Sequence, residues 1–210
     1  MEITITGEAN TLVAPELARL HLNVSFSDRD KARALQNAQS RANGIVAELE
    51  ALPCEILDDF VVGGVTTYSH RPWDGKSRRP TTHVASCAIT AIFKDFSALA
   101  EASAAWGELE GVDVGHTSWQ LTDATREQAL AALIGEALDA ARTKALLIAG
   151  HLGDADVEVV KVSDRSVDSP PVERAFFAAA EGVRGAAAPV EARPEDIRLQ
   201  TSLTVLFATI

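Results

Sequence analysis

The sequence predicts an α+β protein, with a mixed, largely antiparallel sheet that carries its helices on one face. Residues 122–153 repeat apolar side chains at three- and four-residue spacing, which is typical of a long amphipathic helix. Residues 17–26 and 197–207 alternate apolar and polar side chains, as half-buried strands do. The third observation is an internal repeat in the order of these elements.

The repeat runs strand, helix, strand, loop, strand, and it occurs in residues 17–93 and again in 112–208. Both strand-to-helix junctions carry an aspartate, Asp28 and Asp123. The match lies in the pattern and not in residue identity. We therefore expect a βαββ unit used twice, in one domain that spans residues 1–210, with halves at about 10–95 and 110–210.

The stretch 122–153 is the longest predicted helix. Thr122 or Asp123 can cap its start, and Thr125 with Gln128 offers a second possible start. Gly153 tolerates the left-handed conformation that ends many helices. The predicted inner face is mostly Ala and Leu, so its partner can approach closely. That face consists of Leu130, Leu133, Ile134, Ala137, Leu138, Ala141, Ala145, Ile148, Ala149 and Leu152.

Shorter patterns predict the other elements. Pro53 ends the first helix, and Gly63-Gly64 mark a weak point in the strand that follows. The connection 164–196 is unusually long for a compact domain and has room for a short helix near 172–181. Further strands are expected at 2–8, 17–26, 56–68, 82–93, 112–121, 157–162 and 197–207, and helices at about 27–52 and 95–106.

Composition restricts the classes of partner and the location. The formal net charge is -11, which argues against nucleic acid and anionic lipid, since both require clustered basic residues. No stretch approaches the ~20 apolar residues of a membrane helix, so no membrane insertion is expected. No secretory signal is visible, so a cytoplasmic location is expected.

Candidate chemistry is sparse. No two of the five histidines are three or four residues apart, so no helical metal pair is predicted, although His21 and His116 could meet across strands. Cys54 and Cys87 are too few for a disulfide framework, and Cys87 fits a core position. Asp58 and Asp59 point to opposite faces of a strand rather than forming a catalytic pair. We predict no catalytic residue, no metal and no cofactor.

The two long loops carry the residues that best fit an interaction role. The hairpin tip 70–80 is locally basic and aromatic within an acidic protein, and the Ala-rich connection 164–196 carries two adjacent phenylalanines. Aromatic and arginine side chains are enriched at interfaces. The alternative is that these aromatic rings cover the protein's own core. The candidate interaction residues are Arg71, Trp73, Arg78, Arg79, Arg174, Phe176 and Phe177.

Seven segments occur along the chain in this order: ITGEA at 5–9, APELA at 14–18, ALQN at 34–37, SWQLTD at 118–123, DAARTKA at 139–145, HLG at 151–153 and PEDI at 194–197. Taken in order, they resemble the SIMPL-domain family, which includes bacterial periplasmic immunogenic and oxidative-stress-defence proteins. The resemblance implies a single SIMPL-like domain, and it implies assembly, because some members form large rings. It transfers no active site, since the family has no agreed catalytic motif.

The expected function is that of a non-enzymatic, soluble SIMPL-type protein. We expect an oligomeric structural or interaction protein, with a possible protein partner and a possible link to stress. The alternative is a small-molecule-binding protein or an enzyme that uses a cleft between the two halves. A pocket with convergent polar groups would favour the second class, and a self-complementary apolar patch would favour the first.

Overall fold

The computed structural model describes residues 1–71, 80–164 and 194–210. These residues form two compact units. Unit 1 consists of residues 1–15, 121–164 and 194–210, and unit 2 consists of residues 16–71 and 80–120. The predicted helix near 172–181 lies outside the described residues.

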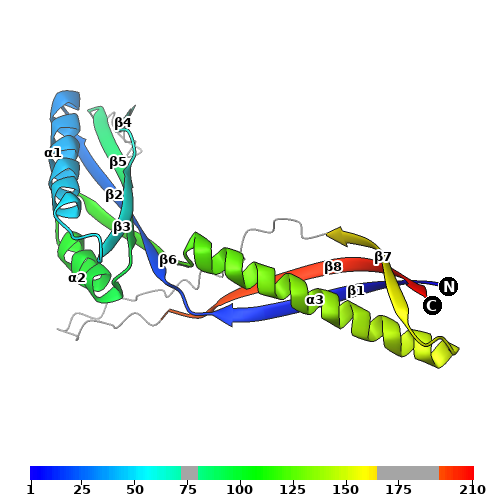
Figure 1. Cartoon of the computed structure of the whole chain (residues 1–210). Coiled ribbons are helices and arrows are strands. Elements are labelled where there is room, and N and C mark those ends of the chain that lie inside the picture. Colours follow the sequence, from blue (N-terminus) through cyan, green and yellow to red (C-terminus); the bar gives the residue numbers. More distant parts are fainter. Residues whose placement is uncertain (72–79, 165–193) are drawn as a thin grey trace, which may run out of the picture. The chain divides into compact units, whose positions relative to one another are not determined.

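Unit 1 is a three-stranded sheet with one long helix on one face. Its strands are β1 (Glu2–Val13), β7 (Val157–Asp164) and β8 (Ile197–Thr209), in the order β1-β8-β7, with both pairs antiparallel. The helix α3 (Asp123–Leu152) packs along β1 and β8, as Figure 1 shows. It makes far less contact with β7, which forms an edge of the sheet.

Both ends of α3 fall where the sequence predicts them. The Oγ1 atom of Thr122 accepts a hydrogen bond from the backbone N–H of Thr125 at 3.3 Å, so the first of the two candidate starts is the correct one. Gly153 ends the helix with φ of 94°, in the left-handed region that favours glycine.

The buried face of α3 is narrower than predicted. Ile134, Ile148 and Leu152 are exposed, although the spacing assigned them to the inner face. The helix rests on only two strands, so a single row at four-residue spacing suffices to fill the contact. The buried residues of that row are Leu133, Ala137, Ala141, Ala145 and Ala149.

The predicted close approach to this alanine row is confirmed at Gly7 of β1. A Cβ atom added to Gly7 would collide with the carbonyl oxygen of Ala137 and would lie 2.9 Å from the Cβ of Ala141. Only a residue without a side chain fits here. The sequence of α3 and the glycine in β1 therefore specify the same contact.

Unit 2 is a five-stranded antiparallel sheet with two helices on one face (Figure 1). The four principal strands lie in the order β3-β5-β2-β6, and β4 also pairs with β5. Asp30 and Asp95 cap the two helices with their carboxylates. The elements are β2 (Leu17–Asp28), α1 (Lys31–Glu50), β3 (Leu57–Val62), β4 (Thr66–His70), β5 (Thr82–Phe93), α2 (Phe96–Gly107) and β6 (Val112–Gln120).

The predicted weak point at Gly63-Gly64 is confirmed, because β3 ends at Val62 and β4 begins at Thr66, while both pair with the same strand β5. The first helix begins later than predicted. The sequence predicts that this helix starts at residues 27–28, but β2 continues through Asp28, which lies opposite His83 of β5. Strand pairing thus overrides the local capping signal there.

The core of unit 2 is built from large side chains. Phe93 and Trp106 lie in its centre, with ring centroids 6.4 Å apart. Trp106 donates a hydrogen bond from Nε1 to Glu48 Oε2 at 2.7 Å, which joins α2 to α1. A second aromatic pair joins α2 to β6, where the rings of Phe96 and Trp119 pack edge to face with centroids 4.9 Å apart.

The α+β class, the helices on one face of each sheet and the largely antiparallel pairing are confirmed, but no parallel pair occurs among the described strands, so the sheets are not mixed. Every described strand pair is antiparallel. The crossover through α1 does bring β3 parallel to β2, but β5 inserts between these two strands and pairs with both. The second βαββ sequence is also divided, because β6 pairs with β2 in unit 2 while α3, β7 and β8 belong to unit 1. The units therefore do not follow the predicted halves 10–95 and 110–210.

Candidate functional surfaces

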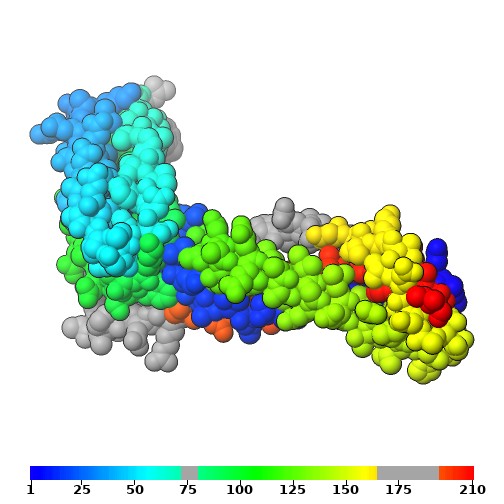
Figure 2. Space-filling view, in the orientation of Figure 1, coloured from blue at the N-terminus to red at the C-terminus, as the bar shows by residue number. Residues whose placement is uncertain are grey.

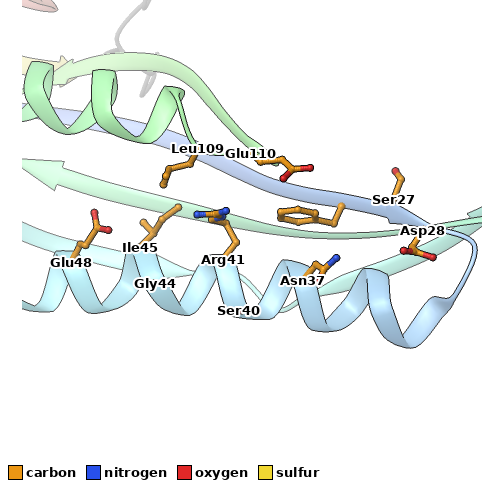
Figure 3. A pocket seen from close by; sticks show the side chains of 11 residues that line it. Ser27, Asp28, Asn37, Ser40, Arg41, Gly44, Ile45, Glu48, Leu109 and Glu110 are labelled. Atoms are coloured by element: carbon orange, nitrogen blue, oxygen red, sulfur yellow. The ribbon is translucent and has the colours of Figure 1, made fainter.

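A cleft of about 590 Å³ opens in unit 2 between α1, the end of β2 and the turn before β6 (Figure 3). Phe26, Ile45 and Leu109 give it an apolar floor. Arg41 extends from α1 toward the turn that carries Leu109 and Glu110. Further polar side chains on its rim are Ser27, Asp28, Asn37, Ser40 and Glu48.

The cleft is acidic. One guanidinium, that of Arg41, lies among the carboxylates of Asp28, Glu48 and Glu110. Glu48 already accepts the hydrogen bond from Trp106, so it is held in place. Only three of its eleven lining residues are apolar, so the cleft is more polar than most small-molecule sites. The charges favour a cationic or zwitterionic molecule over an anion.

A row of serine, histidine and aspartate crosses three strands near this cleft. Ser69 of β4, His83 of β5 and Asp28 of β2 are in register. Ser69 Oγ and His83 Nδ1 are 2.7 Å apart and form a hydrogen bond. Asp28 instead accepts from the backbone N–H of Asp30 at 2.8 Å. The serine is exposed, and the aspartate does not orient the imidazole, so the row lacks the third contact of a catalytic triad. Sequence spacing gave no signal for this row, because strand register assembles it.

His21 and His116 do meet, as the sequence suggested. Their rings stack with centroids 4.6 Å apart on the side of the unit 2 sheet that faces away from α1 and α2. Thr90 Oγ1 lies 3.4 Å from His21 Nδ1. No group of three possible metal ligands occurs among residues 1–71, 80–164 and 194–210. Two stacked imidazoles with a hydroxyl do not provide the ligand set of a zinc site.

The two cysteines are free. Cys87 is buried, as predicted, and its Sγ donates a hydrogen bond to the carbonyl oxygen of Gly63 at 3.2 Å. Burial raises the pKa of the Cys87 thiol, so the reactive thiolate is disfavoured at this position. Cys54 is exposed.

Asp58 and Asp59 do not act together. Asp58 forms an exposed ion pair with Lys94 at 2.9 Å, and Asp59 accepts from the backbone N–H of Phe60. The hydrogen bond that Lys94 donates to the Asp58 carboxylate raises the pKa of Lys94, with neighbouring negative charge adding to the effect. The pair stabilises the β3 edge locally, as a solvated ion pair does.

Of the predicted interaction residues, only Arg71 falls within the described part of the chain. Arg71 is exposed, and its Nη2 donates to Thr81 Oγ1 at 3.1 Å across the base of the hairpin. The other predicted residues of this set lie outside the described residues: Trp73, Arg78, Arg79, Arg174, Phe176 and Phe177.

Unit 1 exposes an apolar surface that the sequence did not reveal. Val159, Val160 and Val162 of β7 have exposed fractions of 50%, 54% and 47%. Leu147 and Leu152, in the last two turns of α3, are also largely exposed. In Figure 2, β7 appears in yellow at the surface of this unit. The three exposed valines of β7 adjoin one another along the strand, and contiguous exposed apolar residues mark interaction sites more often than isolated ones do.

The valines of β7 are exposed because α3 lies over β1 and β8, and no other described helix covers this edge strand. The other edge strand, β1, differs from β7. Its exposed side chains are mostly polar and include Thr4, Thr6, Glu8 and Asn10. The two edges of one sheet therefore present different chemistry, and only β7 is apolar.

No helix within the described ranges of the chain combines the length and apolarity needed to cross a membrane.

The comparisons with known proteins agree with the family that the sequence suggested. The model of the family SIMPL, described as a protein of unknown function (DUF541), matches residues 3–207. The match extends over β1 to β8 and so includes both units. No curated protein matches the chain.

Proposed function

The chain belongs to the SIMPL family, and we propose that it works there as a self-associating structural protein without enzymatic activity. The observation that supports this proposal is the bare apolar edge of unit 1, formed by Val159, Val160 and Val162. An edge strand also presents unpaired backbone groups that invite another strand. A second copy of the same chain would remove both kinds of group from water.

Each of the other candidate sites lacks a feature that its function requires. The serine–histidine–aspartate row is exposed and lacks its orienting contact. The stacked histidines lack further metal ligands in the described residues. The link to stress and the cytoplasmic location rest on the family resemblance and on the N-terminal sequence alone, and they stay predictions.

The test is the mass of the full chain in solution across a range of concentrations, measured by light scattering. We expect a mass above that of the 22.3 kDa chain. Val160→Asp should lower this mass, because it places a charge in the bare edge. Leu12→Asp is the matched control, since Leu12 of β1 is 55% exposed against 54% for Val160.

Both variants change exposed positions, so their unfolding free energies should stay within ~0.5 kcal/mol of the parent value. If the parent is a monomer at every concentration, the proposal fails. If Leu12→Asp lowers the mass as much as Val160→Asp does, the apolar edge of β7 is not the surface responsible.

A second candidate function is the binding of a small cationic or zwitterionic molecule in the unit 2 cleft. Its acidic rim and the floor formed by Phe26 and Ile45 favour it. A screen of amines and amino acids by calorimetry tests it, with Arg41→Gln and Glu110→Gln as the variants. Loss of binding in Glu110→Gln, with retention in a variant far from the cleft such as Glu2→Gln, would support this function.

A further inference from the structure

The first six residues of β7 read almost the same from both ends. Residues 157–162 are Val-Glu-Val-Val-Lys-Val, so apolar and charged positions mirror one another about the bond between Val159 and Val160. The only change on reversal is that Glu158 and Lys161 exchange places, which exchanges a negative charge for a positive one. Such a segment is complementary to an antiparallel copy of itself.

Pairing of β7 with an antiparallel copy of itself sets a condition on the faces to which Glu158 and Lys161 point. In a regular strand, residues three apart point to opposite faces, so Glu158 and Lys161 would not share a face. An antiparallel pair related by a two-fold axis perpendicular to the sheet requires opposite residues to share one. A regular β7 therefore could not place Glu158 beside Lys161 of a second copy.

The β-bulge in β7 satisfies this condition. Val159 lies opposite Phe207 of β8 and Lys161 lies opposite Leu206, so Val160 is the extra residue. Glu158 lies opposite Ala208. Because Ala208 and Leu206 alternate with the buried residues of β8, Glu158 and Lys161 both lie on the sheet face away from α3.

We propose that two copies of this chain pair through β7 in the register that places Glu158 opposite Lys161 of the other copy. In this register Val159 lies opposite Val160, Val157 lies opposite Val162, and each pair occurs twice. The contact rests on the proposed self-association and specifies its surface, its partner and its register. Two three-stranded sheets become one six-stranded sheet.

The arrangement accounts for the exposed groups of β7. Among the described strands β7 pairs only with β8, and the second copy supplies backbone hydrogen bonds to its other edge, which an edge strand otherwise leaves to water. Val159, Val160 and Val162 gain apolar neighbours across the two-fold axis. Two Glu–Lys pairs form on the same solvent-facing side, and opposite charges directly across strands favour the pairing. A bulge and a lysine can also protect an edge against pairing, and the experiment distinguishes these two roles.

Charge exchange tests the register. In Glu158→Lys, lysine faces lysine at both positions of the pair, and in Lys161→Glu, glutamate faces glutamate. Each single variant should raise the dissociation constant of the dimer about tenfold at low ionic strength. The double variant Glu158→Lys with Lys161→Glu restores opposite charges and should return the constant to the parent value. Analytical ultracentrifugation measures all four proteins.

The matched control is Glu8→Lys, which makes the same charge change at an exposed position of the other edge strand β1. Its dissociation constant should equal that of the parent, and thermal melting should show that every variant is folded. High salt should reduce the difference between the single variants and the parent.

The outcomes separate this inference from the proposed function. If the parent associates but the double variant stays as weak as the singles, or the singles dimerise like the parent, this register is wrong while self-association stands. If the parent is a monomer throughout, both fail. If Lys161→Glu strengthens association, Lys161 protects the edge and the inference is overturned.

Discussion

Units 1 and 2 differ in the size of the side chains that fill the centre of their cores. In unit 1, α3 packs through a row of alanines onto a strand that has a glycine at the contact. In unit 2, the first half of α1 also packs through alanines, namely Ala34, Ala38 and Ala42. The second half of α1 and α2 pack instead through large side chains, among them Leu49 and Trp106, against Phe93 of β5. A close contact between small residues tolerates little added volume, whereas a core of large residues is weakened most by lost volume. The two units should therefore fail under opposite substitutions.

The unfolding of each unit can be followed with a separate spectroscopic signal. All three tryptophans lie between residues 16 and 120, which is the range of unit 2. Tryptophan fluorescence thus follows unit 2, whereas far-ultraviolet circular dichroism also reports the 30-residue helix α3 of unit 1.

The largest effect is expected for Ala141→Asp in unit 1. Ala141 is fully buried between α3 and the sheet, so the carboxylate would be unpaired and out of water. We expect the free energy of unfolding to fall by about 5 kcal/mol, measured by denaturant titration followed by circular dichroism. Ala132→Asp makes the same change on the exposed side of α3 and should have little effect. Unfolding of Ala141→Asp at the parent's midpoint would contradict the buried face.

The corresponding change in unit 2 removes volume. Phe93 is fully buried against Trp106, so Phe93→Ala leaves a cavity in the centre of the core. The expected loss is about 3–4 kcal/mol, followed by tryptophan fluorescence. Phe93→Leu keeps most of the volume and should lose less than about 1.5 kcal/mol. Equal losses for the two variants would show that volume does not decide stability here.

Added volume should damage unit 1 next. In Gly7→Ala, the new methyl group would collide with the Ala137 carbonyl, so β1 and α3 must move apart. We expect a loss of about 1–3 kcal/mol, measured by circular dichroism. Gly44→Ala in α1 is the control, because nothing lies within 4 Å of its added Cβ. That variant should gain about 0.5–1 kcal/mol from helix propensity, and a similar gain in Gly7→Ala would contradict the close contact.

The sequence was sufficient for elements whose signals are local. Thr122 and Gly153 fix the ends of α3, and the alternation in residues 82–93 predicts the bounds of β5. It was insufficient where tertiary pairing decides. The placement of β6 beside β2, the exposure of Ile134 and the late start of α1 all depend on which strands meet.

The same distinction between local signals and tertiary pairing applies to the functional surfaces. The meeting of His21 with His116 could be foreseen from strand faces, because both positions fall on one side of neighbouring strands. The bare edge of β7 could not, since it depends on where α3 lies across the sheet. The mirror pattern of residues 157–162 is visible in the sequence, but it acquires meaning only with the bulge at Val160.

The smallest of the expected effects concerns the caps of α2 and α3, where the two units differ in strength. The Oδ1 atom of Asp95 accepts from the backbone N–H groups of Ser97 and Ala98, at 2.8 and 3.1 Å. Thr122 makes one such bond to Thr125, at 3.3 Å. Asp95→Ala leaves two amides of the first turn without a partner and also removes a negative charge that favours the positive end of the helix.

We expect Asp95→Ala to lower the free energy of unfolding of unit 2 by about 1 kcal/mol, measured by tryptophan fluorescence. Thr122→Ala should lower that of unit 1 by about 0.5 kcal/mol, because the capping bond from the Thr125 backbone N–H is longer, at 3.3 Å. Asp95→Asn retains an acceptor oxygen but not the charge, so it separates the hydrogen bonds from the charge effect. A loss in Asp95→Asn as large as in Asp95→Ala would assign the cap to charge, and a larger loss in Thr122→Ala would reverse the order of the two caps.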